Sequence, residues 1–325
     1  MPKVSIVLPN YNYARYLDER IQSLLNQTYS DFELIILDDA STDNSIEVIE
    51  KYTEDPRVKT KYYSENSGST YKRWNDGADL AQGEYLLIAG ADDSCHPMLL
   101  EKLVEKLDTY ASVGLAFSQS LEIDSNGTPV GSMIRGTDRF IKNKERWRAD
   151  FVDRGKNELK NSLIGLTIPN ASAVLMRREI FFVAGKFDKN FTLAADWALW
   201  SKMLMISDIA FVSEPLNYFR IHPQSVSSRV NIKTTLKENC LVFEMIERSL
   251  NETQDSGGSE QADLTNNLWY RRAKYYSSCT WNTRDVIHIS GLILRWHFYT
   301  YQERIYFLIR FWLKSASFFR ISSLF

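Results

Sequence analysis

Two pairs of adjacent acids carry the most suggestive chemistry in this sequence. Asp38-Asp39 follows the apolar run 33–37, and Asp92-Asp93 follows the apolar run 85–89. Carboxylate oxygens are preferred ligands of Mg²⁺ and Mn²⁺, and substrate phosphates commonly complete such sites. Asp92-Asp93 therefore fits a hard-cation site that offsets charge on a leaving diphosphate. Either pair also suits a simple helix cap, and an isolated pair more often has that role.

The loop that contains Tyr11 gives Asp38-Asp39 a second interpretation. A tyrosine ring can stack on a nucleobase, and a carboxylate can accept the ring N–H of uracil or thymine. Because Tyr11 follows a neighbouring strand-like run, nucleotide binding becomes a serious hypothesis for this pair.

Asp196 and His222 are two further candidates. Asp196 opens an amphipathic segment, where an acid is often favoured by the helix dipole alone. The alternative is a general base that removes the proton of an acceptor hydroxyl. The adjacent Trp197 and Trp200 are expected in the core, although one of them could offer a platform for a sugar face. His222 alone suits a satisfied surface or core residue; beside a metal site it becomes a candidate ligand or diphosphate contact.

A parallel sheet would bring these distant residues together. Over the first 120 residues, short apolar runs alternate with amphipathic segments, which is typical of βαβ units. The expected strands are 4–8, 33–37, 58–63, 84–89 and 113–117, and the expected helices are 14–27, 41–52, 71–81 and 97–110. The carboxyl ends of such strands share one edge, where ligands bind. Residues 9–12 and both acid pairs should meet there.

The rest of the chain is less regular. Residues 124–127 predict a hairpin turn, and the polar, basic stretch 135–160 suits a mobile loop or an acceptor-side segment. Further order is expected at 171–176, 196–206, 209–212 and 216–221. From about residue 230 the pattern becomes helical, at 233–250 and from 262 onward, with a polar loop at 251–260.

Composition narrows the class of protein. The 325 residues have a net charge of −2, with 44% hydrophobic and 25% charged residues. These values are typical of a soluble globular protein and give no sign of nucleic-acid binding. Three scattered cysteines, Cys95, Cys240 and Cys279, favour neither a disulfide framework nor a zinc cluster and fit a reducing compartment. Neither a signal peptide nor a membrane-spanning helix is expected.

Six ordered segments within residues 3–228 resemble family 2 glycosyltransferases of the GT-A fold, in particular bacterial cell-surface polysaccharide enzymes. They are VSIVLPNYNYARYL, ELIILDDASTDNS, ENSGSTYKRWNDGADLAQGEYLLIAGADD, NASAVLMRREIF, ADWALW and YFRIHPQSVS. The resemblance implies an α/β, Rossmann-like fold whose mixed, mostly parallel sheet is flanked by helices, with a C-terminal helical extension. The catalytic domain would span 1–228, with a nucleotide-sugar half at 1–117 and an acceptor half at 118–228. A helical region would follow at 229–325.

The resemblance also implies roles for the residues on the donor side. Pro9, Tyr11 and Asp39 would hold the nucleoside, and Asp38 would support their loop. Asp92 would face the ribose or the sugar. The pair Asp92-Asp93 would correspond to the family's DXD motif.

Metal and catalytic roles follow from the same resemblance. Asp93, assisted by His222, would hold Mn²⁺ or Mg²⁺, and Asp196 would be the base of an inverting, single-displacement transfer. Two positions depart from the family pattern. Gly90 stands where many relatives have the first acid of D-x-D-D, and Ala195 replaces the usual acidic neighbour of Asp196. The first departure removes one contact to the ribose or the metal.

The implied reaction moves a sugar from a UDP- or dTDP-sugar to a hydroxyl of a glycan or lipid-linked glycan in cell-surface polysaccharide synthesis. Two alternatives stay open. A nucleotidyltransferase should show a Gly-rich, basic phosphate loop where residues 10–12 stand. A non-catalytic glycan-binding protein would not need Asp93 or Asp196.

The segment 299–325 combines many aromatic and aliphatic side chains with four basic residues and one acid. It suits a helix packed on the catalytic domain or on a second copy of the chain. It suits equally well an interfacial helix on an anionic membrane. In the second case the protein would lie at the cytoplasmic face of the plasma membrane, close to a lipid-linked acceptor.

Overall fold

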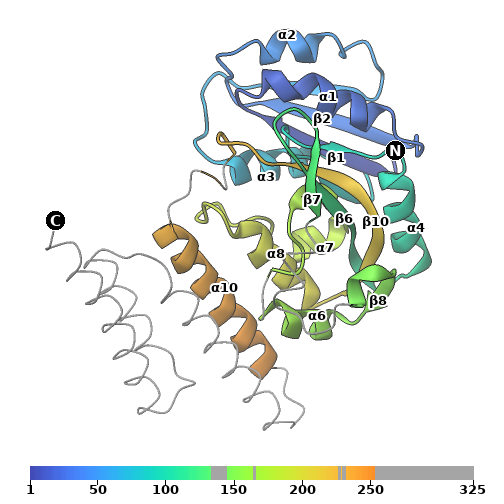
Figure 1. Cartoon of the computed structure of the whole chain (residues 1–325), viewed down its shortest axis with the longest axis vertical. Coiled ribbons are helices and arrows are strands. Elements are labelled where there is room, and N and C mark those ends of the chain that lie inside the picture. The colour runs from blue at the N-terminus through green and yellow to red at the C-terminus, as the bar shows by residue number, and fades with distance from the viewer. Residues whose placement is uncertain (133–144, 164–165, 226–227, 229–231, 253–325) are drawn as a thin grey trace, which may run out of the picture. The chain divides into compact units, whose positions relative to one another are not determined.

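The computed structural model describes residues 1–132, 145–163, 166–225, 228 and 232–252 (Figure 1). The chain divides into two compact units, Met1–Leu250 and Asn251–Phe325. Almost all of the described residues belong to the first unit. The expected domain boundary at residue 228 stays a prediction.

The first half of the sheet is parallel, as the alternation of apolar and amphipathic segments predicts. Its strand order is β3-β2-β1-β4, and every pairing within it is parallel. Three of the four strands are buried along most of their length, which explains their nearly continuous apolar runs. The strands and their connecting helices are β1 (Val4–Asn10), α1 (Ala14–Leu25), β2 (Phe32–Asp38), α2 (Ser45–Glu50), β3 (Val58–Tyr62), α3 (Thr70–Leu80) and β4 (Tyr85–Ile88).

The second half of the sheet is mixed. It continues from β4 through β9, β6, β10 and β5, while β7 pairs with β6 and β8 pairs with β10. β9 is antiparallel to both of its neighbours, whereas β10 is parallel to β6. The bounds are β5 (Ser94–Cys95), β6 (Val113–Ile123), β7 (Pro129–Ser132), β8 (Phe151–Asp153), β9 (Val174–Arg177) and β10 (Asp208–Arg220). The register of β10 shifts around Pro215, so the two strands expected at 209–212 and 216–221 are one irregular strand.

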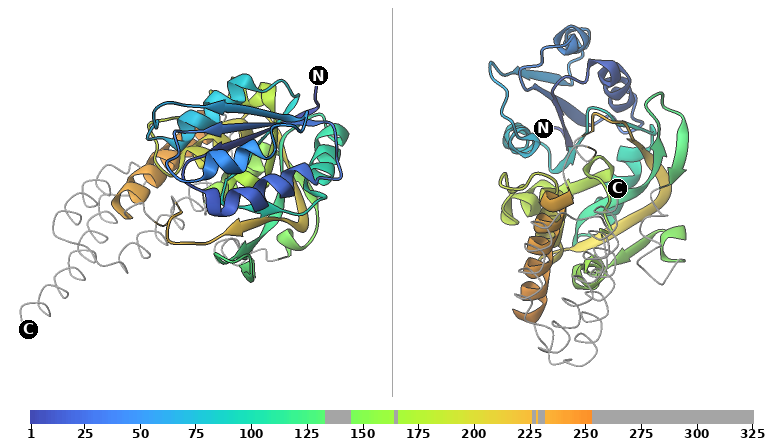
Figure 2. Two further views of the ribbon diagram at one scale, coloured as in Figure 1. Left: turned by 90° about the horizontal axis from the view of Figure 1, so that it is seen from above. Right: turned by 60° about the vertical axis from the view of Figure 1, so that its left-hand side comes forward.

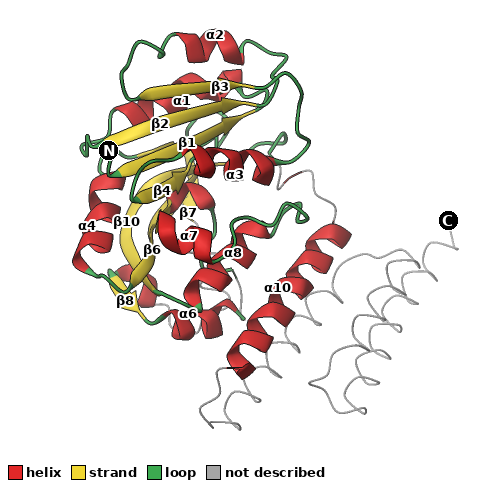
Figure 3. Cartoon of the chain, turned by 180° about the vertical axis from the view of Figure 1, so that it is seen from behind, coloured by secondary structure: helices red, strands yellow, loops and turns green. Residues whose placement is uncertain are grey.

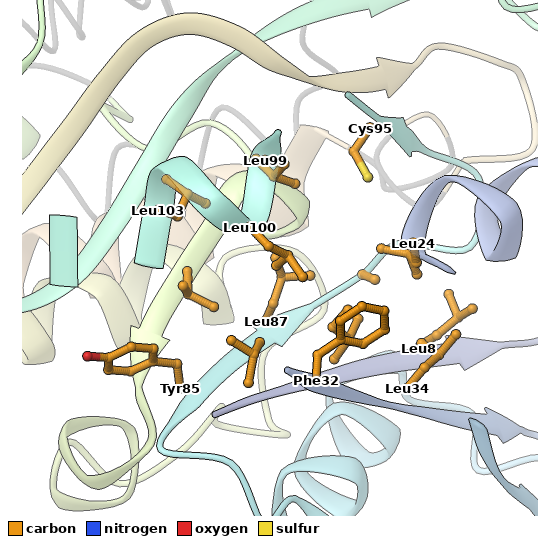
Figure 4. Close-up of a cluster of buried hydrophobic side chains, with 14 of the residues drawn as sticks. Leu8, Leu24, Phe32, Leu34, Tyr85, Leu87, Cys95, Leu99, Leu100 and Leu103 are labelled. Carbon is orange, nitrogen blue, oxygen red and sulfur yellow. The ribbon is translucent and has the colours of Figure 1, made fainter. Parts of the chain in front are cut away.

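Helices cover the two faces of the sheet. Side chains alternate along a strand, and those of Leu8, Leu34 and Leu87 join a core that α1, α2 and α4 (Leu99–Thr109) complete (Figure 4). The blue strands and α1 are seen from two further sides in Figure 2. α3 covers the opposite face, because Gly77 has no side chain to hold it away from Val7.

An aromatic cluster connects α3 to two later helices. Phe187 stacks on Tyr71 of α3 and meets the edge of Trp200, which belongs to α8 (Ala195–Leu204). α7 (Arg178–Val183) contributes Phe181 to the same cluster. Figure 3 shows α3, α7 and α8 together on this side. Trp197 and Trp200 are both buried, as expected of core residues.

Of the two possibilities for residues 135–160, a mobile loop is wrong for residues 146–160, and an acceptor-side segment stays a prediction. A short 3-10 helix (Arg146–Arg148), β8 and α6 (Gly155–Ser162) occupy this stretch. Arg146 pairs with Asp153 and with the fully buried Glu158, and Trp147 is buried nearby. Arg146, one of the basic residues that suggested a loop, is therefore neutralised by acids within the fold. Residues 133–144 lie outside the described part.

The hairpin turn at 124–127 is confirmed by the antiparallel pairing of β6 with β7 and by the left-handed backbone of Gly127. The helix expected at 233–250 is α10 (Ile232–Glu252). No helix among the described residues is long and apolar enough to cross a membrane. The helical pattern predicted from residue 262, including 299–325, lies outside the described residues.

Candidate functional site

The carboxyl ends of β2, β1 and β4 lie side by side, as the parallel topology requires. Asn10 at the end of β1 is in register with Asp38 at the end of β2. β4 ends at Ile88, whose register partner on β1 is Val7. Residues 9–12 and both acid pairs are therefore gathered at one edge of the sheet.

Asp38 holds the loops at this edge. Its buried carboxylate accepts hydrogen bonds from the Asn10 side-chain amide at 2.8 Å and from the Ser41 amide and hydroxyl at 2.9 and 2.6 Å. Asn12 links the same loops, because its Oδ1 accepts the Thr42 amide at 2.7 Å. These contacts suit the loop-supporting role implied for Asp38. Sequence reasoning gave no individual role to Asn10 or Asn12, and expected Ser41 only as a capping residue of the helix at 41–52.

Asp39 belongs to a buried ion pair. Its carboxylate accepts the Ser67 amide and hydroxyl, and Arg73 Nε lies 2.5 Å from Oδ1. The Arg73 guanidinium also lies 3.3 Å from the centre of the Tyr63 ring. A carboxylate offers about four acceptor positions, so these three donors leave room for one more, such as a nucleobase N–H. Tyr11, by contrast, is exposed.

Asp92 and His222 are direct partners although they are 130 residues apart. Asp92 Oδ2 lies 2.9 Å from His222 Nε2, and this hydrogen bond raises the pKa of His222. His222 Nδ1 lies 3.2 Å from Gln224 Oε1. The rings of Tyr13 and Tyr16 lie beside the imidazole, with centroids 5.8 and 5.1 Å away. The imidazole is therefore held with Nε2 facing the acid pair.

Asp93 faces inward and is buried. Ser172 Oγ donates to its Oδ2 at 2.5 Å, and the Arg220 amide donates to its Oδ1 at 3.0 Å. Burial raises the pKa of Asp93, the Asp92 charge raises it further, and the buried Arg20 opposes both effects. Within the described residues, the three guanidinium nitrogens of Arg20 have no hydrogen-bond partner. Arg20 thus acts on Asp93 by its charge.

Arg220 connects the loop after β4 to other parts of the fold. Its Nε donates to the Asp92 carbonyl at 2.7 Å, and its two terminal nitrogens reach the Asp124 carbonyl and the Glu19 carboxylate. Arg220 is almost completely buried. Its position two residues before His222 was a signal that sequence reasoning missed.

Asp196 lies in the first turn of α8 and is partly buried. Burial raises its pKa to about 6, against an ordinary value of 3.8. Its Oδ1 accepts the Trp197 amide at 2.7 Å. A carboxylate with such a pKa is ionised at neutral pH and is a stronger base than an exposed one.

The sequence-predicted acids and His222 therefore form three groups. Asp38 and Asp39 hold loops after β2. The second group is Asp92 with His222, next to the buried Asp93, and the third is Asp196 alone. Among the described residues, no hydrogen bond joins Asp196 to either group. α3 connects the Asp196 segment to the first group: Tyr71 Oη of this helix donates to the Leu193 carbonyl at 2.6 Å, and Arg73 of the same helix pairs with Asp39.

The donor set around Asp92 fits a divalent cation. A carboxylate oxygen and an imidazole nitrogen lie within 2.9 Å of each other, and both ligate Mn²⁺. Gln224 occupies the other ring nitrogen, which is the usual arrangement for a ligating histidine. In the described part of the chain, no three His, Cys, Asp or Glu side chains form a metal cluster. A bound ion would therefore need oxygens from a substrate or water.

Comparison with known proteins identifies the family. The sequence model of Glycosyl transferase family 2 matches residues 5–181, more than half of the chain. An uncharacterized glycosyltransferase of Nostoc sp. is 33% identical over 97% of this chain and 96% of its own length. A putative teichuronic acid biosynthesis glycosyltransferase, TuaG of Bacillus subtilis, is 30% identical over 76% of this chain and 89% of its own.

Solved structures support the fold. TarS residues 1–349 of S. aureus, crystallised with UDP-GlcNAc, matches with a TM-score of 0.68 at 18% identity, over 90% of this chain and 80% of that one. The mannosyltransferase PcManGT of Pyrobaculum calidifontis, in complex with GDP-Man and Mn²⁺, matches with a TM-score of 0.55 at 16% identity, over 97% and 87%. The GT-A-like fold expected from the sequence is confirmed.

Proposed function

Because the chain belongs to glycosyl transferase family 2, we propose that it moves a sugar from a UDP- or dTDP-sugar to a hydroxyl of a glycan or lipid-linked glycan, with inversion at the anomeric carbon. The name of TuaG supports a role in cell-surface polysaccharide synthesis. The complex of TarS with UDP-GlcNAc supports a uridine nucleotide donor.

The observation that carries the proposal is the Asp92–His222 pair at the carboxyl edge of the parallel strands. The family resemblance implies that Asp93 with His222 holds the ion and that Asp92 faces the ribose or the sugar. Asp92 keeps 21% of its side chain exposed, whereas both Asp93 oxygens accept protein hydrogen bonds. We therefore assign Asp92 and His222 to the ion and a positioning role to Asp93.

Mn²⁺ or Mg²⁺ held there would offset the negative charge of the leaving nucleoside diphosphate. The Mn²⁺ in the PcManGT complex supports this choice of cation. His222 must be neutral to bind a metal, with its remaining proton on Nδ1 toward Gln224. Asp93 fixes the loop by its bonds to Ser172 and to the Arg220 amide.

The nucleoside would lie over the loops after β1 and β2. Asp39 would accept the ring N–H of the base, and the exposed Tyr11, with Pro9, would cover a face of the base or ribose. The Arg73 ion pair fixes the Asp39 carboxylate for this purpose. Gly90 supplies no carboxylate, so the ribose or the metal would have one contact fewer than the family's D-x-D-D pattern implies.

Asp196 would be the base. Transfer with inversion requires that the acceptor hydroxyl lose its proton while the anomeric carbon gains oxocarbenium character. The pKa of about 6 leaves Asp196 ionised at neutral pH and able to take that proton. Its partial exposure leaves room for an acceptor.

A panel of UDP-, dTDP- and GDP-sugars, each with Mn²⁺, Mg²⁺ or EDTA, tests the proposal on the full chain. We expect nucleoside diphosphate release from at least one UDP- or dTDP-sugar, dependent on the cation. Proton NMR of the transferred sugar should show the inverted anomer. Absence of release from every donor with both metals would contradict the enzyme assignment, and a retained anomer would contradict inversion.

The same panel separates the alternatives. The family match favours sugar transfer over nucleotidyl transfer, and a nucleotidyltransferase would release pyrophosphate from nucleoside triphosphates instead. A glycan-binding protein without catalysis would leave every donor intact. Peripheral attachment at the cytoplasmic face through 299–325, and self-association through the same segment, remain predictions.

A further inference from the structure

Glu238 on α10 binds the segment that leads into α8. Its carboxylate accepts three consecutive backbone N–H groups, from Thr192 at 2.7 Å, Leu193 at 2.8 Å and Ala194 at 3.0 Å. The side chain is buried, with a relative exposure of 6% for the residue. α8 begins at Ala195, directly after this segment, and Asp196 is its second residue. Glu238 therefore fixes the backbone directly before the proposed base.

Two other contacts hold the same segment. Tyr71 Oη donates to the Leu193 carbonyl at 2.6 Å, and the Ala194 amide of the same peptide donates to Glu238, so the Leu193–Ala194 peptide is bound from α3 as well as from α10. Phe243, about one turn beyond Glu238 on α10, meets the Trp197 ring edge-on at 4.6 Å. The start of α8 is thus held between α3, which also carries Arg73, and α10.

We propose that Glu238 is a positioning residue for the sugar-transfer step, which holds the 192–194 backbone so that the Asp196 carboxylate meets the acceptor hydroxyl. This inference rests on the role of Asp196 in the proposed function. Hydrogen bonds to a carboxylate are stronger than those between neutral groups, and an amide left without an acceptor in a buried place is costly. Three such amides make the turn depend on one side chain from outside the family-matched residues 5–181.

The Glu238 charge has a second effect on the same step. It raises the pKa of Asp196, in addition to the larger effect of burial. Loss of that charge should therefore move the acid limb of the transfer rate to lower pH. A purely structural role, in which Glu238 only attaches α10, would leave this limb in place.

Three variants of the full chain test the proposal, with the donor that turns over fastest in the panel above. Glu238→Gln keeps the shape and removes the charge, Glu238→Asp keeps the charge and shortens the reach, and Glu244→Gln changes an exposed acid on the same helix as a control. We expect kcat to fall roughly 10- to 100-fold in both Glu238 variants, because small misplacements of a catalytic group have such effects. KM for the donor should stay within about twofold, because donor contacts are unaffected.

The pH profile separates the two effects of Glu238. The acid limb of kcat should move to lower pH in Glu238→Gln and stay near its wild-type position in Glu238→Asp. Hydrogen exchange over peptides covering 190–197 should be faster in Glu238→Gln than in the control. Unchanged exchange would overturn the proposal without any substrate.

The failure of this inference can be told apart from failure of the proposed function. If Asp196→Asn is inactive while Glu238→Gln keeps wild-type kcat and acid limb, the positioning role is wrong and the base assignment stands. If Asp196→Asn keeps its turnover, or no donor in the panel is turned over, the proposed function fails and this inference fails with it.

Discussion

Asp196→Asn should abolish transfer and also change how stability depends on pH. Burial raises the pKa of this carboxyl to about 6, above its ordinary value of 3.8. Such a group stabilises the fold fully at pH values below the unfolded pKa, and this contribution is lost as the pH rises through the folded pKa. Asparagine keeps an oxygen for the Trp197 amide and carries no charge. The variant should therefore lack this loss of stability.

The size of the effect follows from the two pKa values. Their difference of about 2 corresponds to about 3 kcal/mol at most, at roughly 1.4 kcal/mol for each tenfold change. Roughly 1.4 kcal/mol of this develops between about pH 5 and pH 8, because the folded group ionises in that window. For a unit of this size, 1 kcal/mol moves Tm by about 2–4 °C. The Tm advantage of the variant should thus grow by roughly 3–6 °C over this pH range.

Calorimetric melting of both proteins from pH 5 to pH 8 measures this difference, and nucleoside diphosphate release measures turnover. Asp31→Asn, at an exposed acid, serves as the control and should track the wild type at every pH. A Tm difference that stays constant across the range would refute the raised pKa of Asp196. Appreciable turnover by Asp196→Asn would refute the base role.

Three further predictions concern the edge of the sheet. His222→Ala should weaken Mn²⁺-dependent UDP binding at least about tenfold in calorimetry. Because the bond to Asp92 raises the pKa of His222, the wild-type affinity for Mn²⁺ should also fall as the pH drops below neutral. An affinity that the substitution leaves unchanged would contradict the first expectation, and one that is constant with pH would contradict the second. Asp39→Ala should cost about 3 kcal/mol in urea unfolding, because Arg73 loses a buried partner, and a cost near zero would mean that the pair is solvated. Gly90→Ala should lower stability by about 1–3 kcal/mol, since its Cβ would lie 3.1 Å from a carboxylate oxygen, and an unchanged Tm would show that the acids can move aside.

The parallel half of the fold was predictable because its physical signal is local. β1, β2 and β4 are buried on both faces, so each is a continuous apolar run in the sequence. Amphipathic segments between such runs predict crossover helices, and parallel topology then places the strand ends at one edge. The acids after β2 and β4 could be located in this way without coordinates.

The second half was harder, because its order depends on distant partners. Arg146 and Glu158 look like solvated charges in sequence and are an internal ion pair in the fold. The bulged β10 looks like two strands, since its alternation breaks at Pro215. The role of Glu238 could not be predicted from the sequence, because the backbone amides that donate to its carboxylate lie 44–46 residues earlier in the chain.

Adjacent acids posed a problem that sequence could not resolve, namely which member of each pair faces the ligand. Consecutive side chains leave an extended backbone in different directions, so two neighbouring carboxylates need different partners. In each pair one member bonds only neutral groups of the surrounding loops: Asp38 through Ser41 and Asn10, and Asp93 through Ser172 and a backbone amide. The other member pairs with a side chain that can carry positive charge, Arg73 for Asp39 and His222 for Asp92.

This division has a consequence for the two neutral-bonded acids. Their carboxylates hold side chains and backbone amides of the surrounding loops, so their loss should disorder those loops before it changes any ligand contact. Asp92 differs because its partner is an imidazole, which becomes a metal ligand once it loses a proton. A cation that takes the place of that proton would keep both side chains together, and this replacement is the physical reason for placing the ion at Asp92 rather than at Asp93.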